Sequence, residues 1–215
     1  MQLYSYFRSS AAYRVRIALN LKQLPYETVA VHLLKDGGQQ LQEPYTTLNP
    51  AALVPALVDD DGTVLTQSLA IIEYLDETHP QPPLMPQDPA QRARVRALAQ
   101  SIACDIHPLN NLRVLRYLKR ELHVSDEARD EWYRHWVHTG LHALERHLAG
   151  SADTGRFCHG DTPTLADVCL VPQVFNARRL GCNVERTPTV ARIDAALREL
   201  PAFIAAAPEN QPDAE

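Results

Sequence analysis

Two serines stand where a helix should begin, directly behind an arginine, in the stretch FRSSAAYRVRIALNLK from Phe7 to Lys22. Serine is a preferred N-cap because its hydroxyl accepts a hydrogen bond from a backbone N–H of the first turn, so Ser9 and Ser10 could simply start the helix. A helix N-terminus also stabilises negative charge. The same residues could therefore hold a bound anion.

Two further features could hold a small charged ligand. Thr66–Gln67–Ser68 precedes a helical run that begins near Leu69. It could be a second N-cap, or its side-chain oxygens and backbone N–H groups could bind a carboxylate and an amine. Val54–Pro55 precedes a short strand, where a residue without an N–H suits the first position. Only about 5–6% of X-Pro bonds are cis, so the sequence alone gives no reason to expect a cis bond there.

Strands and helices must position these residues. Residues 2–6 and 26–31 are rich in aromatic and β-branched side chains and bracket a helical pattern, which predicts a strand–helix–strand unit. Two short strands around the turn Asp60–Asp61–Gly62 follow, and then a helix from about Gln67 to Glu77. The first eighty residues are therefore expected to be mixed α/β.

The second half is predicted to be helical. Residues 79–89 contain five prolines, which favour an extended connector. Helical patterns follow over 90–120, 126–149, 164–179 and two shorter runs that end near Ala206. The expected domains are therefore an α/β domain over 1–80, a proline-rich linker over 81–89 and an all-α domain over 90–215.

Several residues of this half are expected to have structural roles. Thr164 lies three residues before Asp167, a capping-box-like helix start. Pro108 and Pro172 should each kink a helix or interrupt its hydrogen bonds. Cys104 is interpreted as a buried small hydrophobe.

Composition and charge exclude several function classes. The chain has 215 residues, 45% of them hydrophobic, and a formal net charge of -5 with scattered Arg and Lys, so no binding of nucleic acid or of an anionic membrane is expected. No apolar run is long enough to cross a bilayer. The four cysteines form no CxxC pair and no signal-peptide pattern is present, which predicts the cytoplasm. No metal site is expected, because no carboxylate or cysteine motif completes the histidines at 135, 138 and 142.

Three motifs now stand in order along the chain: SSAAYRVRIAL, VPAL and QSLAIIEYL. Their combination resembles the zeta class of glutathione transferases, in particular its maleylacetoacetate and maleylpyruvate isomerases. The likeness runs from Gln2 through the tail and includes LKQLPYE, LNPAALVPAL, CDIHPLNNLRVL, GDTPTLADVCLVPQV and FNARRL.

The resemblance implies a thioredoxin-like domain followed by an all-α domain, a homodimer, and glutathione as a cofactor. In this class the residue before a cis-proline binds glutathione through its backbone, and a Gln-Ser pair holds the γ-glutamyl end. A polar stretch of the helical domain lies beside the site. The residues implied to bind glutathione are Ser9, Val54, Pro55, Gln67, Ser68, His107, Asn110 and Asn111. A thiol of pKa about 8.5 is mostly protonated at neutral pH, and hydroxyl donors at a helix N-terminus favour the thiolate. Ser9 is therefore the expected activator of the glutathione thiol, with Ser10 as a neighbouring donor.

The substrate implied by the resemblance is a diacid with a keto group. A guanidinium binds carboxylates bidentately, so Arg8 and Arg179 are expected to hold its two ends, although an arginine on a loop is usually just solvated. Arg178 is the adjacent alternative and Arg113 a weaker candidate. Reversible addition of the glutathione thiolate to the cis double bond would allow rotation and release of the trans product.

Two other functions remain open at this stage. One is a zeta-like transferase or dehalogenase that conjugates glutathione to α-halo acids. Many zeta members have a cysteine where this chain has Ala11, so a protein cysteine at that position is not expected to serve catalysis here. The other is a non-catalytic protein of the same fold that binds a partner, although such a protein has no need of a thiolate activator beside carboxylate-binding arginines.

Overall fold

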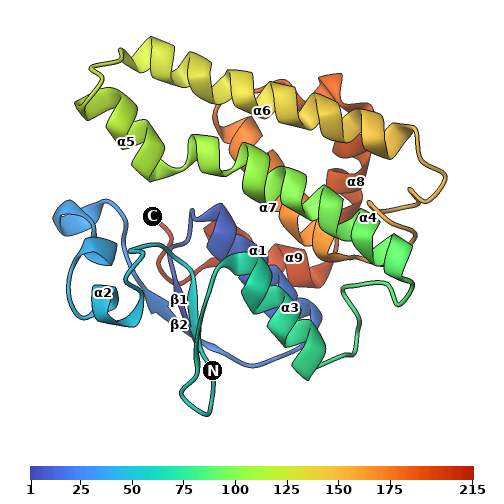
Figure 1. Cartoon of the computed structure of the whole chain (residues 1–215), viewed down its shortest axis with the longest axis horizontal. Coiled ribbons are helices and arrows are strands. Elements are labelled where there is room, and N and C mark those ends of the chain that lie inside the picture. Colours follow the sequence, from blue (N-terminus) through green and yellow to red (C-terminus); the bar gives the residue numbers. More distant parts are fainter. The chain divides into compact units, whose positions relative to one another are not determined.

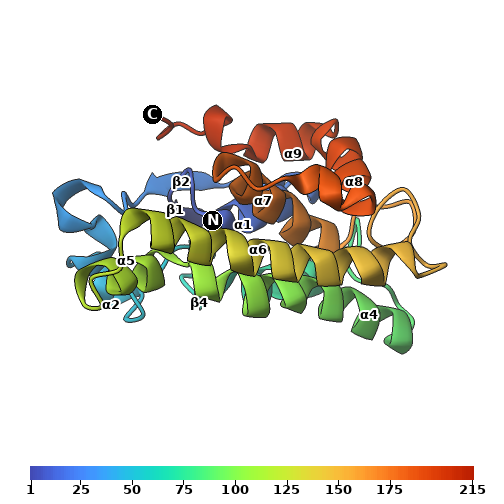
Figure 2. The ribbon, with the colours of Figure 1, turned by 90° about the horizontal axis from the view of Figure 1, so that it is seen from above.

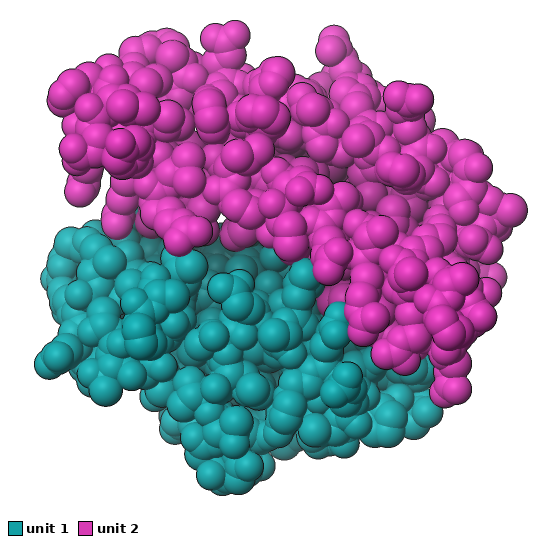
Figure 3. Space-filling view, viewed as in Figure 1, with its two compact units in different colours: residues 1–84, 199–215 teal, residues 85–198 magenta.

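A computed structural model describes residues 1–215, and the chain divides into two compact units (Figure 3). The first combines Met1–Leu84 with Glu199–Glu215, and the second is Met85–Arg198. The expected linker does not separate them cleanly, because Leu84 and Met85 are buried and belong to different units. The last 17 residues, expected in the helical domain, group instead with the α/β unit.

The first unit is built on a four-stranded mixed sheet in the order β2-β1-β3-β4 (Figure 1). The strands are β1 (Gln2–Ser5), β2 (Glu27–Ala30), β3 (Ala56–Val58) and β4 (Val64–Thr66). β1 pairs parallel with β2, as the strand–helix–strand prediction requires, and antiparallel with β3. β3 and β4 form the hairpin around the predicted Asp60–Asp61–Gly62 turn.

Each face of this sheet is covered differently. Leu3 and Leu57 lie opposite each other in the β1–β3 register, and both are fully buried. Helices α1 (Ser10–Leu21) and α3 (Ser68–Thr78) pack together beside the sheet (Figures 1 and 2). Because side chains alternate along a strand, Tyr4 points to the opposite face. There its ring lies 5.9 Å from that of Tyr45 in α2 (Tyr45–Leu48).

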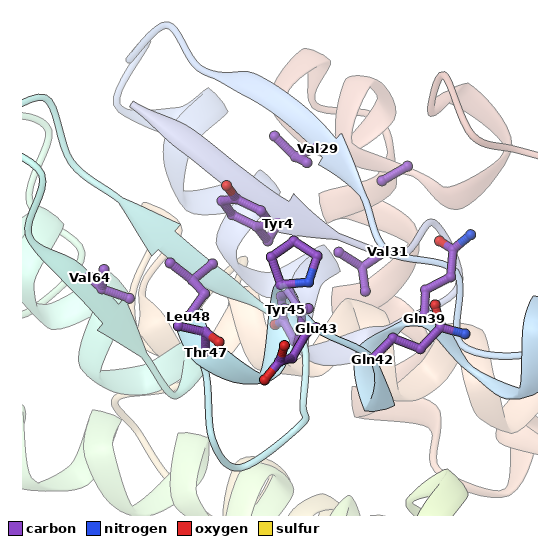
Figure 4. A pocket seen from close by; sticks show the side chains of 12 residues that line it. Tyr4, Val29, Val31, Gln39, Gln42, Glu43, Tyr45, Thr47, Leu48 and Val64 are labelled. Atoms are coloured by element: carbon purple, nitrogen blue, oxygen red, sulfur yellow. The ribbon is translucent and has the colours of Figure 1, made fainter.

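A cavity of about 710 Å³ opens on this second face (Figure 4). Tyr4 and two β-branched residues of the β2 segment, Val29 and Val31, line it from the sheet, and residues 39–48 close it from the other side. None of the predicted ligand-binding residues lines this cavity. It is therefore separate from the expected thiol site.

The C-terminal segment completes the first unit. Helix α9 (Pro201–Ala206) packs along α1, and Asn20 donates a hydrogen bond to the carbonyl of Ala202 at 3.1 Å. Short 3₁₀ turns occur at Lys35–Gly37, Gln39–Leu41 and Pro208–Asn210. The N-terminal sheet and helices thus include a segment from the far end of the chain.

The second unit contains helices α4 to α8 and no strand. Their bounds are α4 (Pro89–Gln100), α5 (Leu112–Arg120), α6 (Asp126–Ala149), α7 (Leu165–Arg179) and α8 (Pro188–Arg198), with a 3₁₀ turn at Val184–Arg186. α7 is the central helix of this unit, because all its residues from Leu165 to Val174 are buried. It runs on through Pro172, and Thr164 and Asp167 form the expected capping box.

The predicted helix over 90–120 is wrong as a single element. After α4 the backbone widens into a π-helical turn at Ser101–Ile106, tightens to a 3₁₀ turn at Pro108–Asn110 and restarts as α5. Pro108 accounts for part of this break because it has no N–H for a helical hydrogen bond. The π-turn carries Ile106 close to Gly140 of α6, where even a Cβ would come within 2.2 Å of the isoleucine side chain.

Two other expectations have clear outcomes. Cys104 is exposed on the π-helical turn, so its interpretation as a buried residue is wrong. No helix of the chain is both long and apolar enough to span a membrane.

Candidate functional site

Ser9 is the N-cap of α1. Its hydroxyl oxygen accepts a hydrogen bond from the N–H of Ala12 at 3.2 Å, and its backbone has the extended conformation typical of a cap. The hydroxyl proton is not used in this bond and can be donated to a ligand. The capping and thiol-activating interpretations of Ser9 are therefore compatible, because they use different parts of one hydroxyl group. Ser10 is the first residue of the helix and is buried.

The loop before Ser9 is held by two partners distant in the sequence. The buried guanidinium of Arg16 donates a hydrogen bond to the carbonyl oxygen of Phe7 at 3.0 Å. The N–H of Phe7 donates a hydrogen bond to the carboxylate of Asp213, also at 3.0 Å. Both backbone groups of Phe7 are thus fixed two residues before Ser9. Arg16 also donates hydrogen bonds to the carbonyl oxygen of Ala206 and to the hydroxyl oxygen of Ser5. Burial lowers the pKa of its guanidinium to about 10.

Arg8 is half-buried rather than freely solvated. Its guanidinium donates to the phenol oxygen of Tyr6 at 2.8 and 3.2 Å and lies 4.9 Å from the ring centroid of Phe7. Such aromatic contacts restrict the side chain and leave other N–H groups of the guanidinium for an anion. Arg8 therefore presents an ordered cation beside Ser9.

Val54 and Pro55 are joined by a cis peptide bond, and β3 begins at the next residue. Neither the N–H nor the C=O of Val54 forms a hydrogen bond within the chain. A residue with both backbone groups unpaired can bind another peptide backbone as a neighbouring strand does. Pro55 itself is buried.

Gln67 and Ser68 mark the start of α3. Gln67 is the N-cap and has φ 68° and ψ 115°, a strained conformation for a residue other than glycine. Ser68 is buried, and its hydroxyl oxygen accepts from Nη1 of Arg14 at 3.2 Å. This bond joins the second turn of α1 to the first residue of α3, and it places a buried cation behind the residue expected to bind a carboxylate.

In the second unit, the predicted polar stretch has mixed roles. Asn110 is buried and donates to the carbonyl of Tyr133 at 3.3 Å, and its Oδ1 has no hydrogen-bond partner. Asn111 is the N-cap of α5 and accepts from the N–H of Arg113. His107 lies at the end of the π-helical turn and is half-buried.

The candidate arginines of this unit differ in their surroundings. Arg178 forms an ion pair with the buried carboxylate of Asp194 in α8, so one side of its guanidinium is already used within the unit. Arg179 is exposed and lines a cavity of about 520 Å³, which Tyr133 also lines. Arg113 is exposed on α5 and does not line that cavity.

Some residues that shape these sites were missed by the sequence analysis. Arg14 reaches Ser68 across 54 positions, and Asp213 reaches Phe7 across 206. Asp213 lies in a polar C-terminal tail that carries no motif. Only a three-dimensional structure brings such residues together, and no local sequence signal points to them.

Comparisons with known proteins agree with this architecture. Residues 3–83 match the family model of the glutathione S-transferase N-terminal domain, and residues 126–209 match that of the C-terminal domain. A probable maleylacetoacetate isomerase from Vibrio cholerae is 57% identical over 99% of this chain and 97% of its own length.

Solved structures agree over the full length. A maleyl pyruvate isomerase described as a bacterial zeta-class glutathione S-transferase is 48% identical, with a TM-score of 0.96 and complete coverage of both chains. A maleylacetoacetate isomerase from Methylobacterium extorquens, solved with bound malonate and glutathione, is 44% identical with the same TM-score and coverage. The chain therefore belongs to the glutathione S-transferase family, and within it to the zeta class.

Proposed function

We propose that this protein is a glutathione-dependent cis–trans isomerase that converts maleylacetoacetate or maleylpyruvate to the fumaryl isomer. Full-length similarity to isomerases of both kinds supports this activity. The observation that carries the proposal is the Ser9 hydroxyl, which caps α1 and still has a proton to donate toward a thiolate. The adjacent Arg8 supplies a cation suited to an acidic substrate.

The residues of the first unit fit glutathione chemically. Glutathione is a tripeptide, and the unpaired N–H and C=O of Val54 match its backbone groups. Its γ-glutamyl end carries a carboxylate and an amine. Ser68 at the start of α3, with Arg14 behind it, and the side chain of Gln67 can supply donors and an acceptor for these groups.

When bound, glutathione supplies a thiolate that adds reversibly to the double bond of the substrate and is regenerated. Ser9 stabilises the charged sulfur by donating its hydroxyl proton, and the N-terminus of α1 adds a favourable partial charge. Ser10 is proposed as the neighbouring donor. Arg8 and Arg179 are proposed to bind the carboxylates and to stabilise negative charge that develops on the adjacent carbonyl. The protein thus orients the reactants and holds charge.

A paired assay tests this proposal. Purified protein is given maleylpyruvate and, separately, maleylacetoacetate at catalytic glutathione concentration, while loss of the cis enone and free thiol are both followed. Turnover with unchanged thiol supports the isomerase, and the ratio of the two rates identifies the preferred substrate. Consumption of one thiol per turnover would indicate a conjugating transferase, and glutathione binding without turnover would indicate a non-catalytic member of the family.

We also propose a homodimer located in the cytoplasm. Light scattering coupled to gel filtration should give about twice the chain mass of 24.1 kDa. A mass of one chain would reject the dimer. Cell fractionation that placed the protein outside the cytoplasm would reject the location.

A further inference from the structure

One cavity of the first unit has no part in the proposed function. It is the cavity of about 710 Å³ on the second face of the sheet, here called the sheet-face cavity (Figure 4). Its walls are the sheet residues Tyr4, Val29, Val31 and Val64 and the segment 39–48. This volume lies in the range of about 300–1,000 Å³ that is typical of sites for small organic molecules. None of the residues proposed to bind glutathione or the diacid lines it.

The sheet has more apolar surface on this face than the chain covers. Tyr4 lies beside Val29 in the β1–β2 register, and both line the cavity. The covering segment contains a helix of only four residues, α2, and Val64 at the other edge of the sheet remains 41% exposed. Open apolar surface in a hollow gains free energy when an apolar group replaces the water there. This face therefore favours an apolar ligand.

The wall opposite the sheet is held by its own hydrogen bonds. Oε1 of Gln39 accepts from the N–H of His32 at 2.8 Å. Nε2 of Gln42 donates to the carbonyl oxygen of Asp36, also at 2.8 Å. A wall that is ordered before a ligand arrives lowers the conformational entropy that binding must remove.

The polar groups still available at this wall are hydrogen-bond acceptors. Glu43 is the one charged residue that lines the cavity, and its exposed carboxylate forms no ion pair within the chain. Oε1 of Gln42 accepts no hydrogen bond. Both oxygens can accept from an ammonium group, and the faces of the Tyr4 and Tyr45 rings attract cations as well. The cavity therefore prefers a cation to an anion, unlike a site for a diacid.

We infer that the sheet-face cavity binds a flat, apolar amine. Its ring system would lie against Tyr4 and the valines of β2, and its ammonium group would be held by Glu43 and Oε1 of Gln42. This site is additional to the proposed isomerase site, and the inference does not rest on the isomerase activity. The acidic diacid substrate carries the wrong charge for it.

Direct binding to the full-length protein tests the inference. The probes are tryptamine and indole-3-propionate, which share an indole ring and a short side chain but end in an ammonium and a carboxylate group. Calorimetry at low ionic strength should show tryptamine binding about tenfold more tightly. Glu43→Gln should weaken tryptamine binding about fivefold and should not weaken indole-3-propionate binding. Val29→Thr keeps the shape of the side chain but adds a hydroxyl to the apolar wall, so it should weaken both probes about threefold.

Two controls show where the amine binds. Glu77→Gln removes an exposed carboxylate of α3 outside the cavity and should leave both affinities unchanged. Saturating glutathione should not displace tryptamine, because the residues proposed to bind glutathione do not line the cavity.

The inference is overturned if the wild type does not bind tryptamine or binds indole-3-propionate as tightly. It is also overturned if Glu43→Gln has no effect, if Glu77→Gln weakens tryptamine binding equally, or if glutathione displaces tryptamine. Glu43→Gln should retain the kcat and KM of the wild type in the isomerase assay. Failure of the amine site would therefore leave the proposed function intact, and absent turnover would leave the amine site intact.

Discussion

At the scale of single residues, Ser9 combines structural and chemical roles in one hydroxyl. Ser9→Ala removes both the cap and the proposed thiolate donor, so we expect a loss of about 1 kcal/mol in unfolding free energy and about a hundredfold loss of turnover. Ultraviolet absorption of the bound thiolate and steady-state kinetics measure the second effect.

Ser9→Thr is the matched control, because threonine keeps a hydroxyl and is also accepted at an N-cap. It should retain most of the thiolate signal. If the signal and the turnover both survive in Ser9→Ala, another residue activates the thiol.

The adjacent arginines of α7 should give opposite phenotypes. Arg179→Ala should raise KM for a diacid while glutathione binding stays nearly intact, because Arg179 lines the cavity of about 520 Å³ in the second unit, away from the residues proposed to bind glutathione. Arg178→Gln should instead lower the free energy of unfolding by about 1–3 kcal/mol, because it leaves the buried carboxylate of Asp194 without its partner. Urea unfolding and kinetics on both variants separate these effects. Equal kinetic defects in both variants would show that the assignment of roles is mistaken.

Local signals identified some of these residues and could not identify others. Ser9 and the start of α3 follow from capping chemistry, and the resemblance extended that reading to Val54 and Pro55. The partner of Ser68, in contrast, is Arg14, which reads in sequence as an ordinary charged residue of an amphipathic helix. Cys104 was misjudged because small apolar neighbours do not reveal which side of a π-helical turn a residue occupies.

At the scale of elements, α7 depends on its capping box. The buried carboxylate of Asp167 accepts hydrogen bonds from the N–H of Cys158 and from the N–H and hydroxyl of Thr164, at 2.8, 2.8 and 2.9 Å. In Asp167→Asn the amide nitrogen cannot accept, so at least one of these donors loses its partner. We expect a loss of about 1–3 kcal/mol in unfolding free energy, measured by urea denaturation.

The loss of unfolding free energy in Asp167→Asn should depend on pH, because the carboxyl group of Asp167 titrates and the amide of asparagine does not. Burial raises the pKa of Asp167 above its ordinary value of about 3.9, so between these two pKa values the folded state holds more protons than the unfolded state. The wild type therefore loses stability from this group as the pH rises through that interval. Its advantage over Asp167→Asn should be larger near pH 4 than at neutral pH. If the stability of the wild type relative to Asp167→Asn instead increased with pH, the hydrogen bonds to the Asp167 carboxylate would favour the charged form more than burial disfavours it.

Element boundaries were predicted well where capping and periodicity act locally. The predicted helix over 126–149 matches α6 because Ser125 caps it and Gly150 follows it. The predicted helix over 90–120 failed as a single element because the backbone widens into the π-turn and breaks at Pro108, and the π-turn places Ile106 against Gly140 of another helix. Periodicity along one segment carries no information about such a contact.

At the scale of the whole molecule, the C-terminal segment belongs to the first unit, which its composition does not indicate. Residues 199–215 were expected to continue the helical domain, but α9 packs on α1 and the polar tail reaches the loop before Ser9. The hydrogen bonds of Arg16 to Ala206 and of Asp213 to Phe7 each span more than 180 positions. Pairings at that separation depend on the assembled first unit.

The tail should therefore affect glutathione binding. Asp213→Ala leaves the N–H of Phe7 without its acceptor and should loosen the loop that positions Arg8 and Ser9. We expect about tenfold weaker glutathione binding, measured by calorimetry, with a smaller loss of thermal stability. Asp213→Asn keeps an oxygen acceptor and should restore most of the affinity, whereas Glu209→Ala changes an exposed residue of the same tail and should have no effect. Unchanged glutathione affinity in Asp213→Ala would limit the tail to a role in stability. Failure of Asp213→Asn to recover binding would assign the effect to charge near Arg16 instead of the hydrogen bond to Phe7.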